Sequence, residues 1–166
     1  MEPPRSPPAA CGFVSVGWWR GGRESCSVGL SPEGGCMSVR PTITPAALRF
    51  IVASKARWPS DEYRCFKPCQ ISAITGEWGE HAWGNATDHL AYGWRGRRRL
   101  RKDVEWSLQM AEYFNIDVIL HDGFVWRRDN DFVAEPLRPQ DNPHTNSVHH
   151  SFLPRSEGTP PGCGDG

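Results

Sequence analysis

Apolar residues recur at helical spacing in two segments of the chain. Thr44 and Pro45 suit the N-cap and the first position of a helix, and the apolar pattern that follows must end before Pro59. A second apolar stripe runs through 103–114, and Asn115 is a suitable stop. The pattern therefore predicts two helices, one after Thr44 and one over 103–114.

Short runs rich in β-branched and aromatic residues predict strands between and after these segments. The runs occupy 63–66, 86–92, 116–120, 124–126 and 148–152. Asp122-Gly123 is a typical two-residue hairpin turn between the third and fourth runs. Because helices and strands do not alternate regularly, we expect an α+β fold, with a small antiparallel sheet and flanking helices.

Glycine and proline divide the chain into a body and two ends. Residues 1–36 contain seven glycines and five prolines, and residues 154–166 contain four and three. The 166 residues suit one domain of ordinary size. We expect a disordered or non-native extension over 1–36, a folded domain over 37–153, and a Gly/Pro-rich tail over 154–166.

Charge and hydropathy exclude some classes of function. Nineteen basic residues balance nineteen acidic ones, so the whole chain has no field that would attract polyanions. No apolar run reaches the ~18 residues of a membrane-spanning helix. The N-terminus also lacks the pattern of a secretory signal.

The segment 95–102 is a local exception, because six of its eight residues are basic. Such a run can dock anionic cell-wall polymers or nucleic acid, although a solvated loop leading into the helix over 103–114 is the simpler interpretation. A nucleic-acid role is the less favoured of the two binding hypotheses.

The six cysteines include one closely spaced pair, Cys65 and Cys69. This spacing suits two metal ligands or a disulfide. Isolated cysteines of this kind are more often plain thiols, which is the interpretation we prefer from the sequence.

Residues that bind hard metal ions gather in two places. His81 and Asp88 form the first group, and His144, His149 and His150 form the second. A hydrolytic zinc site needs three ligands of histidine or carboxylate type and an open position for water. Since neighbouring residues of a strand point to opposite faces, only one of His149 and His150 can contact an ion that His81 and Asp88 bind.

The first group resembles the signature of a known enzyme family. His81-x-x-Gly84-x-Ala86-x-Asp88 is similar to the H-x-x-G-x-A-x-D motif of the zinc D-alanyl-D-alanine carboxypeptidases. That family includes phage endolysin peptidases and vancomycin-resistance dipeptidases. Tyr63-Arg64 and the segment 144–152 resemble the motifs that flank the signature, and the resemblance covers about residues 37–163.

The resemblance implies a site and an activity. His81, Asp88 and His149 would be the ligands of a zinc ion at one edge of the sheet, and Arg64 would face the substrate carbonyl or carboxylate. Zinc-activated water would cleave stem or cross-bridge peptides of peptidoglycan, as a D-Ala-D-Ala carboxypeptidase or an endolysin-type endopeptidase. Such an enzyme would stay in the host cytoplasm before phage lysis or travel with the virion, and would act on the cell wall.

The chain departs from the family where a catalytic base is expected. Asn146 stands in place of the acidic residue, and an amide does not accept a proton. Ser147 and Gly79 replace two further family residues. His144 or Asp141 could serve as the base, the enzyme could be slow, or the domain could bind the cell wall without cleaving it.

The remaining candidates are expected to have supporting roles. His89 and His121 match no ligand position and are expected to be structural. Glu77 and Glu80 flank the first ligand, where they could orient it or be ordinary surface charges.

Overall fold

The computed structural model describes residues 43–65, 67, 69–71, 78–139, 141–154, 160 and 163. The predicted extension over 1–36 and most of the predicted tail over 154–166 lie outside the described residues. The elements in chain order are α1 (Pro45–Arg57), β1 (Glu62–Arg64), η1 (Glu80–Trp83), β2 (Ala86–Leu90), α2 (Gly93–Gln109), α3 (Ala111–Phe114), β3 (Ile116–His121), β4 (Phe124–Arg127), η2 (Arg128–Asn130), β5 (Glu135–Pro136) and β6 (Ser147–Phe152).

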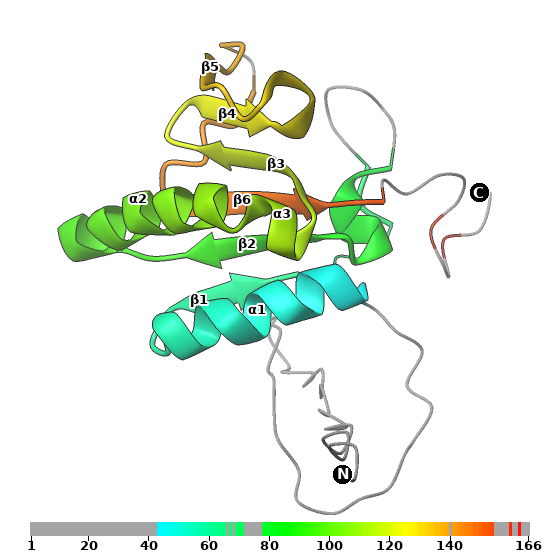
Figure 1. Ribbon diagram of the computed structural model, residues 1–166, viewed down its shortest axis with the longest axis horizontal. Helices are drawn as coiled ribbons and strands as arrows, with labels where there is room; N and C mark the ends of the chain where they lie inside the picture. Colours follow the sequence, from blue (N-terminus) through cyan, green and yellow to red (C-terminus); the bar gives the residue numbers. More distant parts are fainter. Residues whose placement is uncertain are drawn as a thin grey trace, which may run out of the picture.

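The strands form one six-stranded antiparallel sheet, in the order β1-β2-β6-β3-β4-β5. The predicted α+β class with an antiparallel sheet is therefore confirmed. The last strand, β6, lies between β2 and β3 in the middle of the sheet (Figure 1). This insertion brings the two groups of predicted metal ligands onto neighbouring strands.

The helices cover one face of the sheet. In Figure 1, α1 and α2 lie on the same side of it; α1 contacts β2 and β6, and α2 contacts β2, β3 and β6. Phe50 of α1 is fully buried and packs against Phe114 and Phe152, with ring centroids 5.4 and 5.5 Å apart. The strand residues that point toward the helices form the core together with them. The opposite face of the sheet is not covered by α1 or α2.

Helix α1 begins as the sequence predicts. The Thr44 side chain accepts a hydrogen bond from the backbone N–H of Ala47, and Pro45 is the first helical residue. The helix ends at Arg57, before Pro59. Local capping chemistry is enough to place this element.

The start of the second helix was predicted wrongly. Helix α2 begins at Gly93 rather than at 103, so the basic segment 95–102 forms its first turns and is not a loop. The glycine at position 96 counts against a helix in this segment of the sequence, because glycine disfavours helices. A Cβ at Gly96 would lie 2.7 Å from the carbonyl carbon of Ala91, so the glycine is needed where the helix approaches the end of β2.

A buried polar network fastens α2 to the sheet. The ring nitrogens of His89 lie 2.9 Å from Asp103 Oδ2 and 3.0 Å from Asp61 Oδ2. Arg99 donates two hydrogen bonds to Asp61, of 2.9 and 2.7 Å, and the ring of Tyr63 stacks on His89. This is in keeping with the structural role expected for His89.

The interpretation of the cysteines as plain thiols is wrong for all three that the structure describes, because Cys65, Cys69 and Cys163 are each disulfide-bonded. Cys69 and Cys163 form a disulfide, although 94 residues separate them. The Cys65–Cys69 pairing suggested by their spacing is therefore not formed. Sequence spacing could not reveal the Cys69–Cys163 bond, because Cys163 lies near the end of the chain, far from Cys69.

Among the described residues, no helix combines the length and the apolar character needed to cross a bilayer.

Replacing Phe50 with alanine should destabilise the domain by about 3–5 kcal/mol, because it removes a fully buried ring from between the helices and the sheet. Urea unfolding followed by circular dichroism measures this change. Val52→Ala on the same helix is the control, since Val52 is 49% exposed and should cost less than about 0.5 kcal/mol. Equal losses in the two variants would contradict this account of the core.

The network around Asp61 should make stability depend on pH. Burial raises the pKa of Asp61, but the hydrogen bonds from Arg99 and His89 outweigh burial, and the net pKa lies below its usual value. The ionised carboxylate therefore stabilises the fold above about pH 4, the value in an unfolded chain, and this contribution disappears as the pH falls further. The difference in unfolding free energy between the wild type and Asp61→Asn should shrink between pH 6 and pH 3. A constant difference would show that the charge of Asp61 contributes nothing.

Candidate metal centre

The pairing of β2 with β6 sets two of the predicted ligands side by side. Asp88 lies directly opposite His149, and Arg64 of β1 lies opposite Asp88 on its other side. Directly paired residues share a face of the sheet, so the three form a row across three strands. Their neighbours His89 and His150 are fully buried on the helix-covered side, which places the row on the opposite face.

The third predicted ligand comes from outside the sheet. His81 lies in η1, the short 3-10 helix that precedes β2. Gly84 ends this helix with a φ of +68°, a conformation that favours glycine, and turns the chain into β2. The Nδ1–H of His81 donates a 2.6 Å hydrogen bond to the carbonyl of Cys65, so Nε2 is the atom that can bind a metal ion once it has lost its proton.

The three side chains converge on one point. His81 Nε2 lies 3.3 Å from Asp88 Oδ2 and 3.2 Å from His149 Nδ1, and His149 Nδ1 lies 2.9 Å from Asp88 Oδ1. Their ligand atoms all lie within 4.8 Å of one another, so the group could hold a metal ion. The expected position at an edge of the sheet is wrong, because β2 and β6 are its second and third strands. The insertion of β6 causes this difference.

Asn85 holds the loop between the first two ligands in place. Its buried side-chain amide lies 2.5 Å from the carbonyl of Phe152 and 3.1 Å from Glu80 Oε2. The Thr44 hydroxyl donates to its Oδ1 at 3.1 Å. One side chain thus connects η1, the end of β6 and the start of α1, which fixes His81 relative to the sheet.

The electrostatics of the group suit cation binding. Burial raises the pKa of Asp88, but hydrogen bonds from His149 and His81 outweigh it and hold the pKa well below its usual range. Burial lowers the pKa of His81, while the hydrogen bond and the charge of Asp88 raise it, with a net increase. Asp88 is therefore ionised at neutral pH and offers a negative charge to a cation or to the imidazoles.

The other predicted catalytic residues lie around this group. Arg64 shares the row of Asp88, and its guanidinium donates to Glu62 Oε1 at 3.1 Å while 41% of its side chain stays exposed. Asn146 is exposed and directly precedes β6. Asp141 accepts hydrogen bonds from Arg138. Within the described residues, neither Asn146 nor Asp141 belongs to the three-residue metal group.

His144 lies closer to the group. Its ring centroid is 5.6 Å from that of His149. Burial, followed by the charge of His149, lowers the pKa of His144 to about 4, so its imidazole is neutral at pH 7. The Nδ1–H of His121 faces the backbone carbonyls of His144 and Ser147, and so steadies the loop that carries His144.

The alternative ligand His150 does not face the group. It is fully buried on the helix side, where its Nε2 lies 2.9 Å from Ser107 Oγ, and burial lowers its pKa to about 4. Of the two adjacent histidines, His149 is therefore the one that the fold places beside Asp88 and His81.

Sequence reasoning missed two supports of His81. The first is the backbone carbonyl of Cys65, which no side-chain pattern could reveal. The second is Asn85, which lies inside the signature at a position the motif leaves variable. Of the predicted supports, Glu80 accepts a hydrogen bond from Asn85, and Glu77 lies outside the described residues.

Comparisons with protein-family models, curated proteins and solved structures found no match to this chain.

Zn²⁺ titrated into metal-free protein should bind one site per chain, and Asp88→Asn should weaken that binding by more than about 100-fold. The amide keeps the shape of the side chain but lacks the negative charge and is a poorer ligand. Competition against a chromophoric chelator measures the affinity. Asp129→Asn, at an exposed aspartate of η2, is the matched control and should bind as the wild type does. Equal affinity in the two variants would show that zinc binds elsewhere.

Proposed function

We propose that this protein is a zinc-dependent peptidase that cleaves the stem or cross-bridge peptides of bacterial peptidoglycan. The observation that carries the proposal is the convergence of His81, Asp88 and His149, whose ligand atoms lie within 4.8 Å of one another. Two histidines and one carboxylate are a ligand set of hydrolytic zinc enzymes, in which a fourth position accepts water.

The three side chains would hold the zinc ion, which when bound lowers the pKa of its water to about 7 and polarises a carbonyl. The rest of the site orients them. The carbonyl of Cys65 fixes the tautomer of His81, and strand pairing fixes Asp88 against His149. These constraints leave few rotamers to be restricted when a metal ion binds.

Arg64 can bind the substrate. It lies in the same row of the sheet as Asp88, and its guanidinium is exposed beside Glu62. An exposed ion pair of this kind contributes little to stability, so the guanidinium can exchange Glu62 for a substrate carbonyl or carboxylate. In this role it would stabilise negative charge that develops at the scissile bond.

The substrate class comes from the motif. The signature 81–88, preceded by Tyr63-Arg64 and followed by the histidine-rich segment 144–152, resembles enzymes that act on peptides containing D-amino acids. D-Ala-D-Ala carboxypeptidase and endolysin-type endopeptidase activities are both consistent with this site. A phage-encoded enzyme would reach the wall at lysis or from the virion.

A second candidate is a wall-binding module with impaired catalysis. It is favoured by one observation, Asn146, which stands where the family has an acidic base. Loss of a general base typically reduces the rate by about 10²–10⁴-fold. A protein of this kind would keep its zinc and its affinity for the wall while releasing little product.

Purified protein incubated with cell walls should release peptidoglycan fragments, and a chelator should stop the release until zinc is added back. Mass spectrometry of the fragments identifies the bond that is cleaved. Asp88→Asn should be inactive, while Asp129→Asn should behave as the wild type. Zinc-loaded wild type that releases nothing would favour the binding module over the peptidase.

Asn146→Asp should raise the rate of release by about 10-fold or more, because it restores an acidic group where the family has its base. The control is Asn142→Asp, which adds the same charge to the same loop and keeps an oxygen for the backbone N–H of His144. A similar gain in both variants would assign the effect to charge alone. No gain in Asn146→Asp would mean that another group already serves as the base.

A further inference from the structure

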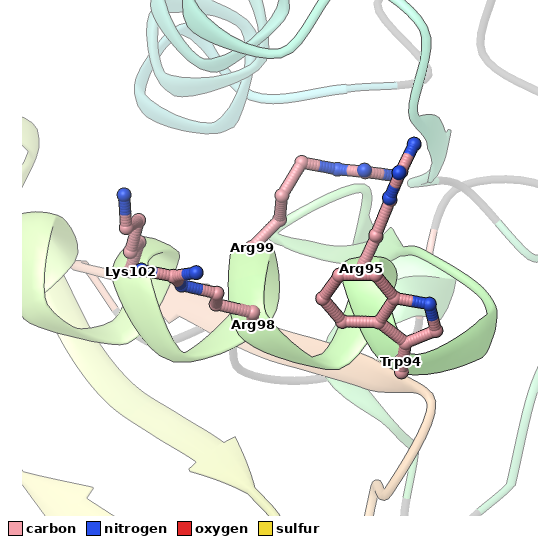
Figure 2. A pocket seen from close by; sticks show the side chains of 5 residues that line it. All are labelled: Trp94, Arg95, Arg98, Arg99 and Lys102. Atoms are coloured by element: carbon pink, nitrogen blue, oxygen red, sulfur yellow. The ribbon is translucent and has the colours of Figure 1, made fainter.

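The exposed side of α2 carries a basic pocket that the proposed catalysis does not use. The pocket is open, measures about 400 Å³, and is lined by Trp94, Arg95, Arg98, Arg99 and Lys102. Figure 2 shows these five side chains projecting from successive turns of the helix. The four cations belong to the basic segment 95–102, for which the sequence suggests binding of anionic polymers, and Trp94 directly precedes that segment.

Most of the charge in this pocket is uncompensated. Arg99 is held by its two hydrogen bonds to Asp61. In the described part of the chain, no carboxylate lies within ion-pair distance of Arg95, Arg98 or Lys102. These three lie three and four residues apart on one helix, where like charges repel and destabilise the helix. A bound anion would remove this repulsion.

Exposed aromatic rings accompany the cations. Trp94 is 71% exposed and Tyr92, directly before the helix, is 61% exposed. The guanidinium of Arg95 lies 5.2 Å from the centre of a Trp94 ring. This cation–π contact holds the guanidinium on the side of the pocket where Trp94 lies. An indole in this position can also contact the carbon atoms of a sugar or polyol.

The spacing of the cations suits a polymer better than a single anion. Arg95 and Lys102 are seven residues apart, which is about 10 Å along a helix at 1.5 Å per residue. One phosphate cannot contact both ends of such a row, whereas successive phosphates of a chain can. Arginine binds phosphate through two parallel hydrogen bonds, and lysine binds it as a point charge.

Two observations favour a wall polymer over a nucleic acid. Helix α2 covers the face of the sheet opposite the row of Asp88 and His149, so a chain bound there leaves the candidate metal centre accessible. The disulfide between Cys69 and Cys163 is typical of proteins that work in oxidising surroundings outside the cytosol, where the polyanions of the wall are the abundant phosphate polymers.

We propose that the exposed face of α2, formed by Trp94, Arg95, Arg98 and Lys102, binds the polyol-phosphate backbone of an anionic cell-wall polymer. The choice of the wall as its source rests on the proposed function. Binding at this face holds the protein on the wall while the opposite face of the sheet meets the peptides.

The test is a titration of the full chain with purified, deacylated poly(glycerol phosphate), followed by calorimetry at two salt concentrations. Three phosphate contacts, each releasing about 0.7 counterion, predict about 20-fold weaker binding at 200 mM than at 50 mM salt. Arg98→Glu/Lys102→Glu should weaken binding at 50 mM salt by at least about 10-fold and flatten the salt dependence. Arg49→Glu, at an exposed arginine of α1, is the matched control and should bind as the wild type does.

Several results would overturn the proposal. They are no binding at 50 mM salt, unchanged binding by the double variant, or an equal loss in Arg49→Glu. Tighter binding of a single-stranded oligonucleotide with the same number of phosphates would instead assign the face to nucleic acid. Circular dichroism checks that the double variant folds, and Arg98→Gln/Lys102→Gln replaces it if it does not. The titration needs neither zinc nor cleavage, so failure of the proposed peptidase activity and failure of this surface are distinguishable.

Discussion

The candidate site depends on the antiparallel register between β2 and β6. This register places Asp88 opposite His149, although 61 residues separate them in the chain. A shift of one residue would turn His149 into the core and expose His150 in its place. The core prevents the shift, because the ring of His150 lies 4.3 Å from that of Phe50, and Val148 and Phe152 are fully buried beside it. Core packing and site geometry are therefore set by the same strand pairing.

The fold class could be predicted because the signals for most of its elements are local. Thr44 and Pro45 mark the start of α1, and Asp122-Gly123 marks the turn between β3 and β4. The start of α2 could not be predicted, because the reason for Gly96 is its contact with Ala91, which exists only after folding. The two-residue strand β5 is too short to leave a pattern.

The candidate metal group could be predicted only in part. Strand alternation correctly separated His149 from His150, and the signature paired His81 with Asp88. The position of the group within the sheet could not be foreseen, since it depends on β6 entering between β2 and β3. The supports of His81 were also hidden, because a backbone carbonyl has no sequence signal and the amide of Asn85 acts through groups far away in the chain.

The attachment of Asn85 has a consequence for how the protein would exchange its ion. In small zinc domains the metal supplies the folding energy, and its removal unfolds the chain. Here the buried amide of Asn85 joins Glu80 of η1 to the end of β6 without the help of a cation. If a metal ion binds there, little of its binding free energy would be needed to order the chain, because the ligands are already held in place.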